Sequence, residues 1–202
     1  MAEKSSAPSW SNLREIDIET YDVPYPGREK FWPTFKEENW SGGITDGKYY
    51  LTNSTDPGGL QYMWQEMKFD ASNLPVTADV SFADSQKNSL SAAGLLYRFD
   101  ERTKFYYAFC IGRDGLYTFY RRDANGVNPI SSGRAQINGK TDIRLGIIGD
   151  GGQLRLYVND VLVKVVQDDA LKSGFSGVAA AGLGAFGFDN LTVYAATSQP
   201  PQ

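Results

Sequence analysis

Short runs in which apolar and polar residues alternate fill most of this 202-residue chain. The alternation predicts strands, because successive side chains of a strand point to opposite faces of a sheet. Glycine, aspartate and asparagine separate the runs, which is typical of hairpin turns. The predicted strands, roughly eleven in number, cover residues 48–52, 60–67, 76–82, 92–99, 105–111, 116–122, 143–148, 154–158, 161–166, 177–181 and 185–194.

Helical periodicity is nearly absent from the chain. Only residues 168–172 fit one short helical turn. The connections between the predicted strands are too short for the crossover helix that joins parallel strands. The sequence therefore predicts an all-β protein, folded as an antiparallel two-sheet β-sandwich of the jelly-roll type.

The alternation also assigns the faces of individual strands. In 143–147 and 154–158 one set of positions is aliphatic, while the other carries Arg144, Arg155 and Tyr157. One face of these strands is expected in the core, and the other is expected to meet solvent or a ligand.

Residues 105–111 are apolar on both sides, which is typical of a strand in the middle of a sheet. Cys110 belongs to this run. Because nothing in the sequence supplies a base to activate its thiol, Cys110 is expected to be a small buried hydrophobe and not a nucleophile. Trp32, Trp40 and Trp64 are likewise expected to be core residues.

Composition removes several kinds of chemistry. The chain has no histidine and a single cysteine, Cys110. This excludes a Ser-His-Asp or Cys-His catalytic pair, a histidine-ligated metal, an intrachain disulfide and a cysteine metal cage. The formal net charge of −4 argues against a nucleic-acid-binding surface, which needs clustered basic side chains.

The chain ends differ from its centre. Residues 1–30 lack sustained periodicity and are interpreted as an N-terminal arm, 31–196 as the β-sandwich domain, and 197–202 as a disordered tail. The first 20 residues are polar and contain no apolar core of signal-peptide length. Two expectations follow: a cytoplasmic protein, or a processed or recombinant form of a secreted one. No segment is expected to insert into a membrane.

Several segments, in this order and spacing, resemble bacterial domains of the concanavalin A-like lectin/glucanase superfamily, and most closely its laminin G-like and 3-keto-disaccharide hydrolase-like branches. The resemblance covers about residues 35–195. It implies a jelly roll in which one curved sheet offers a concave face to a glycan. The segments are 39–40 (NW), 46–51 (DGKYYL), 93–99 (AGLLYRF), 105–109 (FYYAF), 114–117 (DGLY), 154–160 (LRLYVND) and 187–193 (GFDNLTV).

Glycoside hydrolysis is one activity within that superfamily. Members that hydrolyse glucans carry their two carboxylates as alternating Glu and Asp on one central strand. This chain has no Glu-x-Asp-x-Glu pattern, and no glutamate follows Glu101. Asp100 and Glu101 are interpreted as a solvated charged turn, so no catalytic residue is predicted.

Carbohydrate binding requires aromatic rings, on which sugars stack, and donors for their hydroxyl groups. Seven strand residues supply both if they share one face. The alternative is an ordinary solvent-facing sheet with arginines that extend to water. The predicted ligand-binding residues are Arg98, Tyr106, Tyr120, Arg122, Arg144, Arg155 and Tyr157.

The resemblance also implies one candidate for a structural calcium ion. Lectin-like relatives often hold calcium near the last strand, and the matching residue here is Asp189. Asp46 and Asp56 are further candidates, although turn formation accounts for both without a metal. No cofactor is otherwise expected.

The sequence as a whole favours a non-catalytic binding module that recognises carbohydrate on the concave sheet face. The alternative is a structural or interaction protein that self-assembles, or docks on a larger complex, through its N-terminal arm or its sheet edges. The expected partner is accordingly a glycan or a protein, including a second copy of the chain.

Overall fold

The computed structural model describes residues 13–15, 32–54, 59–65, 74–83, 91–139 and 141–196. Within these ranges every regular element is a strand and every pairing is antiparallel, which confirms the predicted fold class. The strands are β1 (Leu13–Glu15), β2 (Phe35–Lys36), β3 (Trp40–Thr45), β4 (Lys48–Asn53), β5 (Leu60–Gln65), β6 (Val76–Phe82), β7 (Ala92–Phe99), β8 (Tyr106–Gly112), β9 (Leu116–Asp123), β10 (Gly126–Arg134), β11 (Asp142–Asp150), β12 (Gln153–Val158), β13 (Val161–Gln167), β14 (Phe175–Ala181) and β15 (Gly184–Ala196).

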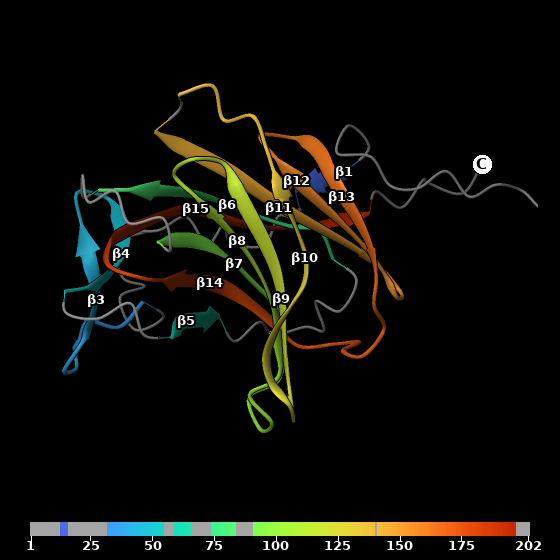
Figure 1. Ribbon diagram of the computed structural model, residues 1–202, viewed down its shortest axis with the longest axis horizontal. Coiled ribbons are helices and arrows are strands. Elements are labelled where there is room, and N and C mark those ends of the chain that lie inside the picture. The colour runs from blue at the N-terminus through green and yellow to red at the C-terminus, as the bar shows by residue number, and fades with distance from the viewer. Residues whose placement is uncertain are drawn as a thin grey trace, which may run out of the picture.

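The strands form two sheets that stack as a jelly-roll sandwich. The nine-stranded sheet has the order β13-β12-β11-β6-β15-β4-β3-β2, with β1 paired to the end of β15. The six-stranded sheet has the order β10-β9-β8-β7-β14-β5. Figure 1 shows β3 and β4 at one end of the molecule and β13 toward the other. The edge strands β2 and β5 belong to different sheets, and residues of both regions line one pocket.

The core lies between the sheets, where the alternation predicted it. On β8, Tyr107 and Phe109 point into the core, while Tyr106 and Cys110 pack in a second cluster on the opposite side of the sheet. All four are fully or almost fully buried. β8 lies between β7 and β9, as expected for a strand that is apolar on both sides.

Two of the predicted turns are confirmed by the pairing. Asp150 pairs with Gln153 at the end of the β11–β12 hairpin. Val158 pairs with Val161 across the two-residue turn Asn159-Asp160. Both turn residues have positive φ, 49° and 65°, which a right-twisted two-residue hairpin requires and which Asn and Asp tolerate.

The helical turn predicted at 168–172 is wrong, because this segment is a loop between β13 and β14. Side chains satisfy its backbone instead. The Asp168 carboxylate accepts the Ala170 N–H at 3.1 Å, and the Tyr107 hydroxyl accepts the Leu171 N–H at 3.2 Å. Local polarity suggested a helix, but contacts with β8 stabilise an extended loop.

The alternation did not predict β2, β3 and β10. β10 contains Pro129 and is largely exposed, which is compatible with its place at the edge of the six-stranded sheet. β3 contains adjacent glycines. At Gly42 a Cβ would lie 2.2 Å from a ring carbon of Phe35, so this close approach of β2 and β3 leaves no room for a side chain.

The ends of the chain are described only in part. β1 lies within the predicted arm and pairs with the end of β15, with Leu13 opposite Ala196. The remainder of residues 1–30, apart from 13–15, and the predicted tail 197–202 lie outside the described residues.

Trp32 and Trp40 are buried in the core as expected, and the Trp64 side chain lies outside the description. Among the described segments, no helix has the length and apolar character to cross a bilayer.

Candidate functional site

The outer face of the six-stranded sheet combines small residues at its centre with aromatic residues around them. Strand register places Ala179 opposite both Tyr62 and Gly94, and Gly94 opposite Cys110. These small side chains form a low floor between β5 and β8. Larger side chains on both sides of this floor are therefore able to lean over it.

Tyr62, Phe99 and Tyr106 form an aromatic cluster over that floor. The Tyr62 ring lies 5.1 Å from the Phe99 ring and 5.1 Å from the Tyr106 ring, measured between centroids. Separations of this kind are favourable for aromatic pairs. Tyr106 is fully buried beneath its neighbours, whereas Tyr62 is half-buried. Tyr62 is thus the member of the cluster that reaches the surface.

Arg122 lies directly opposite Tyr106 on β9. Burial raises the pKa of Tyr106 to about 12, and the neighbouring Arg122 guanidinium opposes that rise. Arg121, the preceding residue, points to the other side of the sheet, where it pairs with Asp123 at 2.9 Å and with Asp168. Two adjacent arginines therefore have different roles, one inside the sandwich and one on its outer face.

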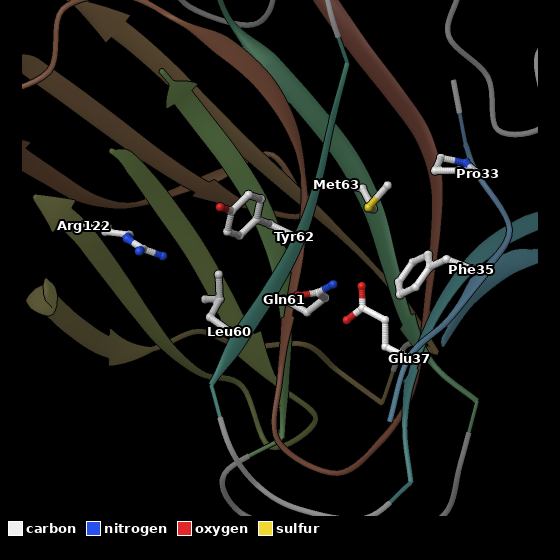
Figure 2. A pocket seen from close by; sticks show the side chains of 8 residues that line it. All are labelled: Pro33, Phe35, Glu37, Leu60, Gln61, Tyr62, Met63 and Arg122. Carbon is white, nitrogen blue, oxygen red and sulfur yellow. The ribbon is translucent and has the colours of Figure 1, made fainter. Parts of the chain in front are cut away.

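A pocket of about 490 Å³ opens beside the aromatic cluster, where β5 approaches the region of β2. Figure 2 shows Tyr62 and Arg122 on one side of β5, and Phe35 and Met63 on the other. The Glu37 carboxylate points toward the Gln61 side chain. We call this the edge pocket. Its lining residues are Pro33, Phe35, Glu37, Leu60, Gln61, Tyr62, Met63 and Arg122.

The structure brings three of the seven predicted ligand-binding residues together. Tyr106, Tyr120 and Arg122 share the outer face of the six-stranded sheet, because Tyr120 pairs with Ala108 and Arg122 with Tyr106. Tyr120 and Arg122 are half-buried. A ligand-binding role for these three remains a prediction.

Arg98 does not join that face. Its side chain is 1% exposed, its Nη1 donates to the Leu171 carbonyl at 2.7 Å, and its Nη2 donates to the Gly151 carbonyl at 3.0 Å. The positive φ of Arg98, 52°, coincides with a register shift between β7 and β14. This bulge turns the guanidinium toward two loops, which strict alternation could not predict.

Arg144, Arg155 and Tyr157 lie on the outer face of the other, nine-stranded sheet. Arg144 Nη2 donates to the Tyr194 hydroxyl at 2.6 Å, and Arg144 Nε lies 3.5 Å from the Asp160 carboxylate. Arg155 and Tyr157 are buried there, at 9% and 8% exposure. The seven residues are therefore divided between two faces and an interior anchor, so they do not form one surface.

The sequence patterns did not predict Tyr62 or the other lining residues that do not lie on β9. One signal was available, since Leu60 and Tyr62 alternate with Gln61 and Met63 along a predicted strand. Alternation shows that Leu60 and Tyr62 share a face. It does not show that this face meets Arg122, because strands β14, β7 and β8 lie between β5 and β9.

Comparisons with known proteins agree on the architecture. A carbohydrate-binding module, CBM66, from Bacillus subtilis matches with a TM-score of 0.56 and 19% identity, over 82% of this chain and 96% of that chain. A Bacillus subtilis protein of unknown function with a galectin-like fold matches with a TM-score of 0.66 and 14% identity, over 90% and 97%. The laminarinase catalytic domain of Thermotoga maritima matches with a TM-score of 0.60 and 10% identity, over 93% and 100%.

The fold is concanavalin A-like. At these identities the likeness concerns the fold alone, and it includes both a binding module and a catalytic domain. No protein-family model matches the sequence, and no curated protein matches it significantly. The concanavalin A-like architecture therefore does not decide between binding and catalysis, and the residues of the site have to be considered directly.

Carboxylates are scarce among the described residues near the edge pocket of this concanavalin A-like domain. Glu37 is the single acidic residue among the eight that line it. Asp100, at the end of β7, accepts the backbone N–H groups of Thr103 and Arg102, which lower the pKa of its carboxyl group. Asp100 is thus occupied in turn formation, as the sequence indicated.

Asp189, the calcium candidate, lies on the outer face of the nine-stranded sheet opposite Asp79. One Asp189 oxygen accepts the Asn190 N–H, and Asn190 also donates to Asp79. Calcium takes six to eight oxygen ligands. Among the described residues, no group of three or more Cys, Asp or Glu side chains is placed to hold a metal. Calcium at Asp189 remains a prediction.

Proposed function

We propose that this protein is a non-catalytic carbohydrate-binding module whose ligand occupies the edge pocket. The observation that carries the proposal is the half-buried Tyr62 ring, which borders the same pocket as Arg122 and Gln61. A sugar stacks its apolar face on such a ring and exchanges hydrogen bonds with the polar side chains. A volume of about 490 Å³ is within the usual range for small-ligand sites.

Buried neighbours support Tyr62 as a stacking platform. Its ring packs against Phe99 and Tyr106, both fully buried, so its orientation is restricted before a ligand arrives. A ring that is already ordered loses little conformational entropy on binding. The Gln61 amide and the Glu37 carboxylate add a donor and acceptors for hydroxyl groups.

Among the described residues, the edge pocket has no pair of acids, and this supports a binding role. Hydrolysis of a glycosidic bond requires two carboxyl groups, roughly 5 to 9.5 Å apart. The lining of the edge pocket supplies one, Glu37. Among the described strand residues on the outer face of the six-stranded sheet, no carboxylate points the same way as Tyr62 and Arg122.

Changing Tyr62 to alanine is expected to weaken saccharide binding about two- to tenfold, because stacking on one aromatic ring is worth roughly 0.5 to 1.5 kcal/mol. Affinity electrophoresis or a glycan array would identify a binding saccharide, and titration calorimetry would measure the change. Tyr50→Ala is the matched control, since Tyr50 is also half-buried but lies on β4 in the other sheet. Equal losses in both variants would contradict the proposed site.

Self-association through β13 is the second candidate function. β13 is an edge strand, and Val161, Leu162 and Val165 on it are 64%, 48% and 42% exposed. An exposed apolar edge strand is a template for pairing with another chain. Antiparallel pairing with a second copy, centred on Leu162, would bring Lys164 of each copy near the turn residue Asp160 of the other, which also lies 3.5 Å from its own Arg144. This charge complementarity favours a second copy as the occupant.

If β13 joins two copies, the protein is expected to have a dimeric mass in light scattering, and Leu162→Glu is expected to make it monomeric. The substitution places a like charge at the proposed axis, where both copies would meet. Val127→Glu is the control, because Val127 is 44% exposed but lies on β10. A monomeric mass for the unmodified protein at high concentration would exclude this candidate.

A further inference from the structure

We propose that the edge pocket selects saccharides that carry a carboxylate, that is, chains containing uronic acid residues, and that Arg122 is the residue that binds the acid group. This inference rests on the proposed carbohydrate-binding function and makes it narrower. It concerns the charge of the ligand, which neither the fold nor the comparisons address.

Arg122 has no counter-ion among the residues that the structure describes. Arg122 is half-buried, yet no carboxylate of the described residues lies within ion-pair distance of it. Asp123, the next residue in the chain, and Asp168 are both engaged by Arg121 on the inner side of the sheet. A partly desolvated cation without a counter-ion gains most from an anionic ligand.

Tyr106 does not supply a negative charge that would balance the Arg122 guanidinium. Its hydroxyl lies beside the Arg122 guanidinium, but burial holds its pKa at about 12, so the phenol is neutral at physiological pH. Tyr106 therefore does not neutralise Arg122. The planar guanidinium keeps donors available for two parallel hydrogen bonds to a carboxylate, a geometry that lysine does not offer.

The edge pocket has a positive charge on one side of β5 and a negative charge on the other. Figure 2 shows Arg122 on one side of β5 and Glu37 on the other, with Tyr62 and Gln61 between them. The Glu37 carboxylate accepts hydrogen bonds from sugar hydroxyls and repels a second carboxylate. A uronate is thereby oriented, with its acid group at Arg122, its ring face over Tyr62 and its hydroxyls toward Gln61 and Glu37.

The test compares ligands that differ only in charge. Trimers of galacturonic, glucuronic and mannuronic acid are titrated into the protein by calorimetry, each beside its methyl ester. At least one acid is expected to bind at least tenfold more tightly than its ester. Arg122→Gln is expected to reduce the affinity for the acid to that for the ester, while Arg122→Lys restores part of the difference. Raising the salt concentration is expected to weaken the binding of the acid and to leave the binding of the ester unchanged.

Arg134→Gln is the matched control, because Arg134 lies on the adjacent strand β10 and is more exposed. The Arg134→Gln variant is expected to bind the acids and the esters with the same affinities as the unmodified protein. Melting curves verify that each variant is folded. If neutral saccharides or the esters bind as tightly as the acids, and Tyr62→Ala weakens that binding, acid selection is wrong and the proposed function stands. If no saccharide binds, charged or neutral, the proposed function itself is wrong.

Discussion

Between pH 10 and pH 12 the protein is expected to lose its folded structure in one cooperative step. Burial raises the pKa of Tyr97 and of Tyr106 to about 12, and it raises the pKa values of Tyr49 and Tyr107 further. The ordinary value for tyrosine is 10.0. Above pH 10 the unfolded chain therefore ionises these phenols, while the folded protein keeps them protonated.

The direction of the change in stability follows from the linkage between folding and protonation. Below pH 10 the phenols are protonated in both states, and their contribution to stability is complete. As the pH rises toward 12, each phenol costs up to about 1.4 kcal/mol of stability per pH unit. Several phenols acting together exhaust the roughly 5 to 15 kcal/mol that stabilises a typical domain. The buried thiol of Cys110, whose pKa is also raised to about 12, adds to the loss.

Tyrosinate absorbance and circular dichroism, recorded together during an alkaline titration, measure this transition. The two signals are expected to change at the same pH. Tyr106→Phe removes one of the buried phenols and is expected to move the midpoint upward. Complete ionisation of the tyrosines with an unchanged dichroism spectrum would show that the phenols titrate in the folded state, contrary to the expectation.

Arg98→Ala is expected to destabilise the protein by about 3 to 5 kcal/mol, because each of two hydrogen bonds from its charged side chain contributes roughly 1.5 to 3 kcal/mol. The side chain is 1% exposed and donates to the carbonyls of Leu171 and Gly151, which belong to two different loops. Its removal leaves both carbonyls without this donor and opens a cavity. The loss should appear as a lower midpoint in urea denaturation.

Two further variants separate charge from volume. Arg98→Met keeps most of the side-chain volume but none of the donors, and is expected to recover only a small part of the loss. Arg102→Ala is the control. The Arg102 side chain is 91% exposed, and it comes no closer than 4.0 Å to the Asp100 carboxylate. If Arg98→Met were as stable as the unmodified protein, the hydrogen bonds to the loops would contribute nothing and packing alone would explain the effect.

Alternation predicted the strands of this fold well, because burial in a sandwich depends on which face a residue occupies. The prediction that residues 105–111 form a strand with two apolar faces and a buried Cys110 needed no tertiary information. Where alternation is interrupted, the prediction failed. β10 carries Pro129 and mostly polar residues, and its strand conformation depends on pairing with β9.

The candidate site was predictable only in part, for a related reason. Tyr106, Tyr120 and Arg122 lie on two neighbouring strands joined by a short turn, so their common face follows from local register. The Tyr62 ring contacts Tyr106 from a strand that is distant in sequence. Arg98 does not lie on their face of the sheet, because a bulge turns its side chain the other way. Strand order and bulges arise from the packing of the whole domain, which local patterns do not contain.

The burial of Cys110 has a practical consequence for spectroscopy. Its thiol is 1% exposed and protonated at neutral pH, so thiol-reactive dyes and spin labels will not modify it in the folded protein. A cysteine introduced at the rim of the edge pocket would then be the one site labelled, without first replacing the native residue. A reporter group placed in this way beside Arg122 would follow ligand entry directly, in a protein whose sequence is otherwise unchanged.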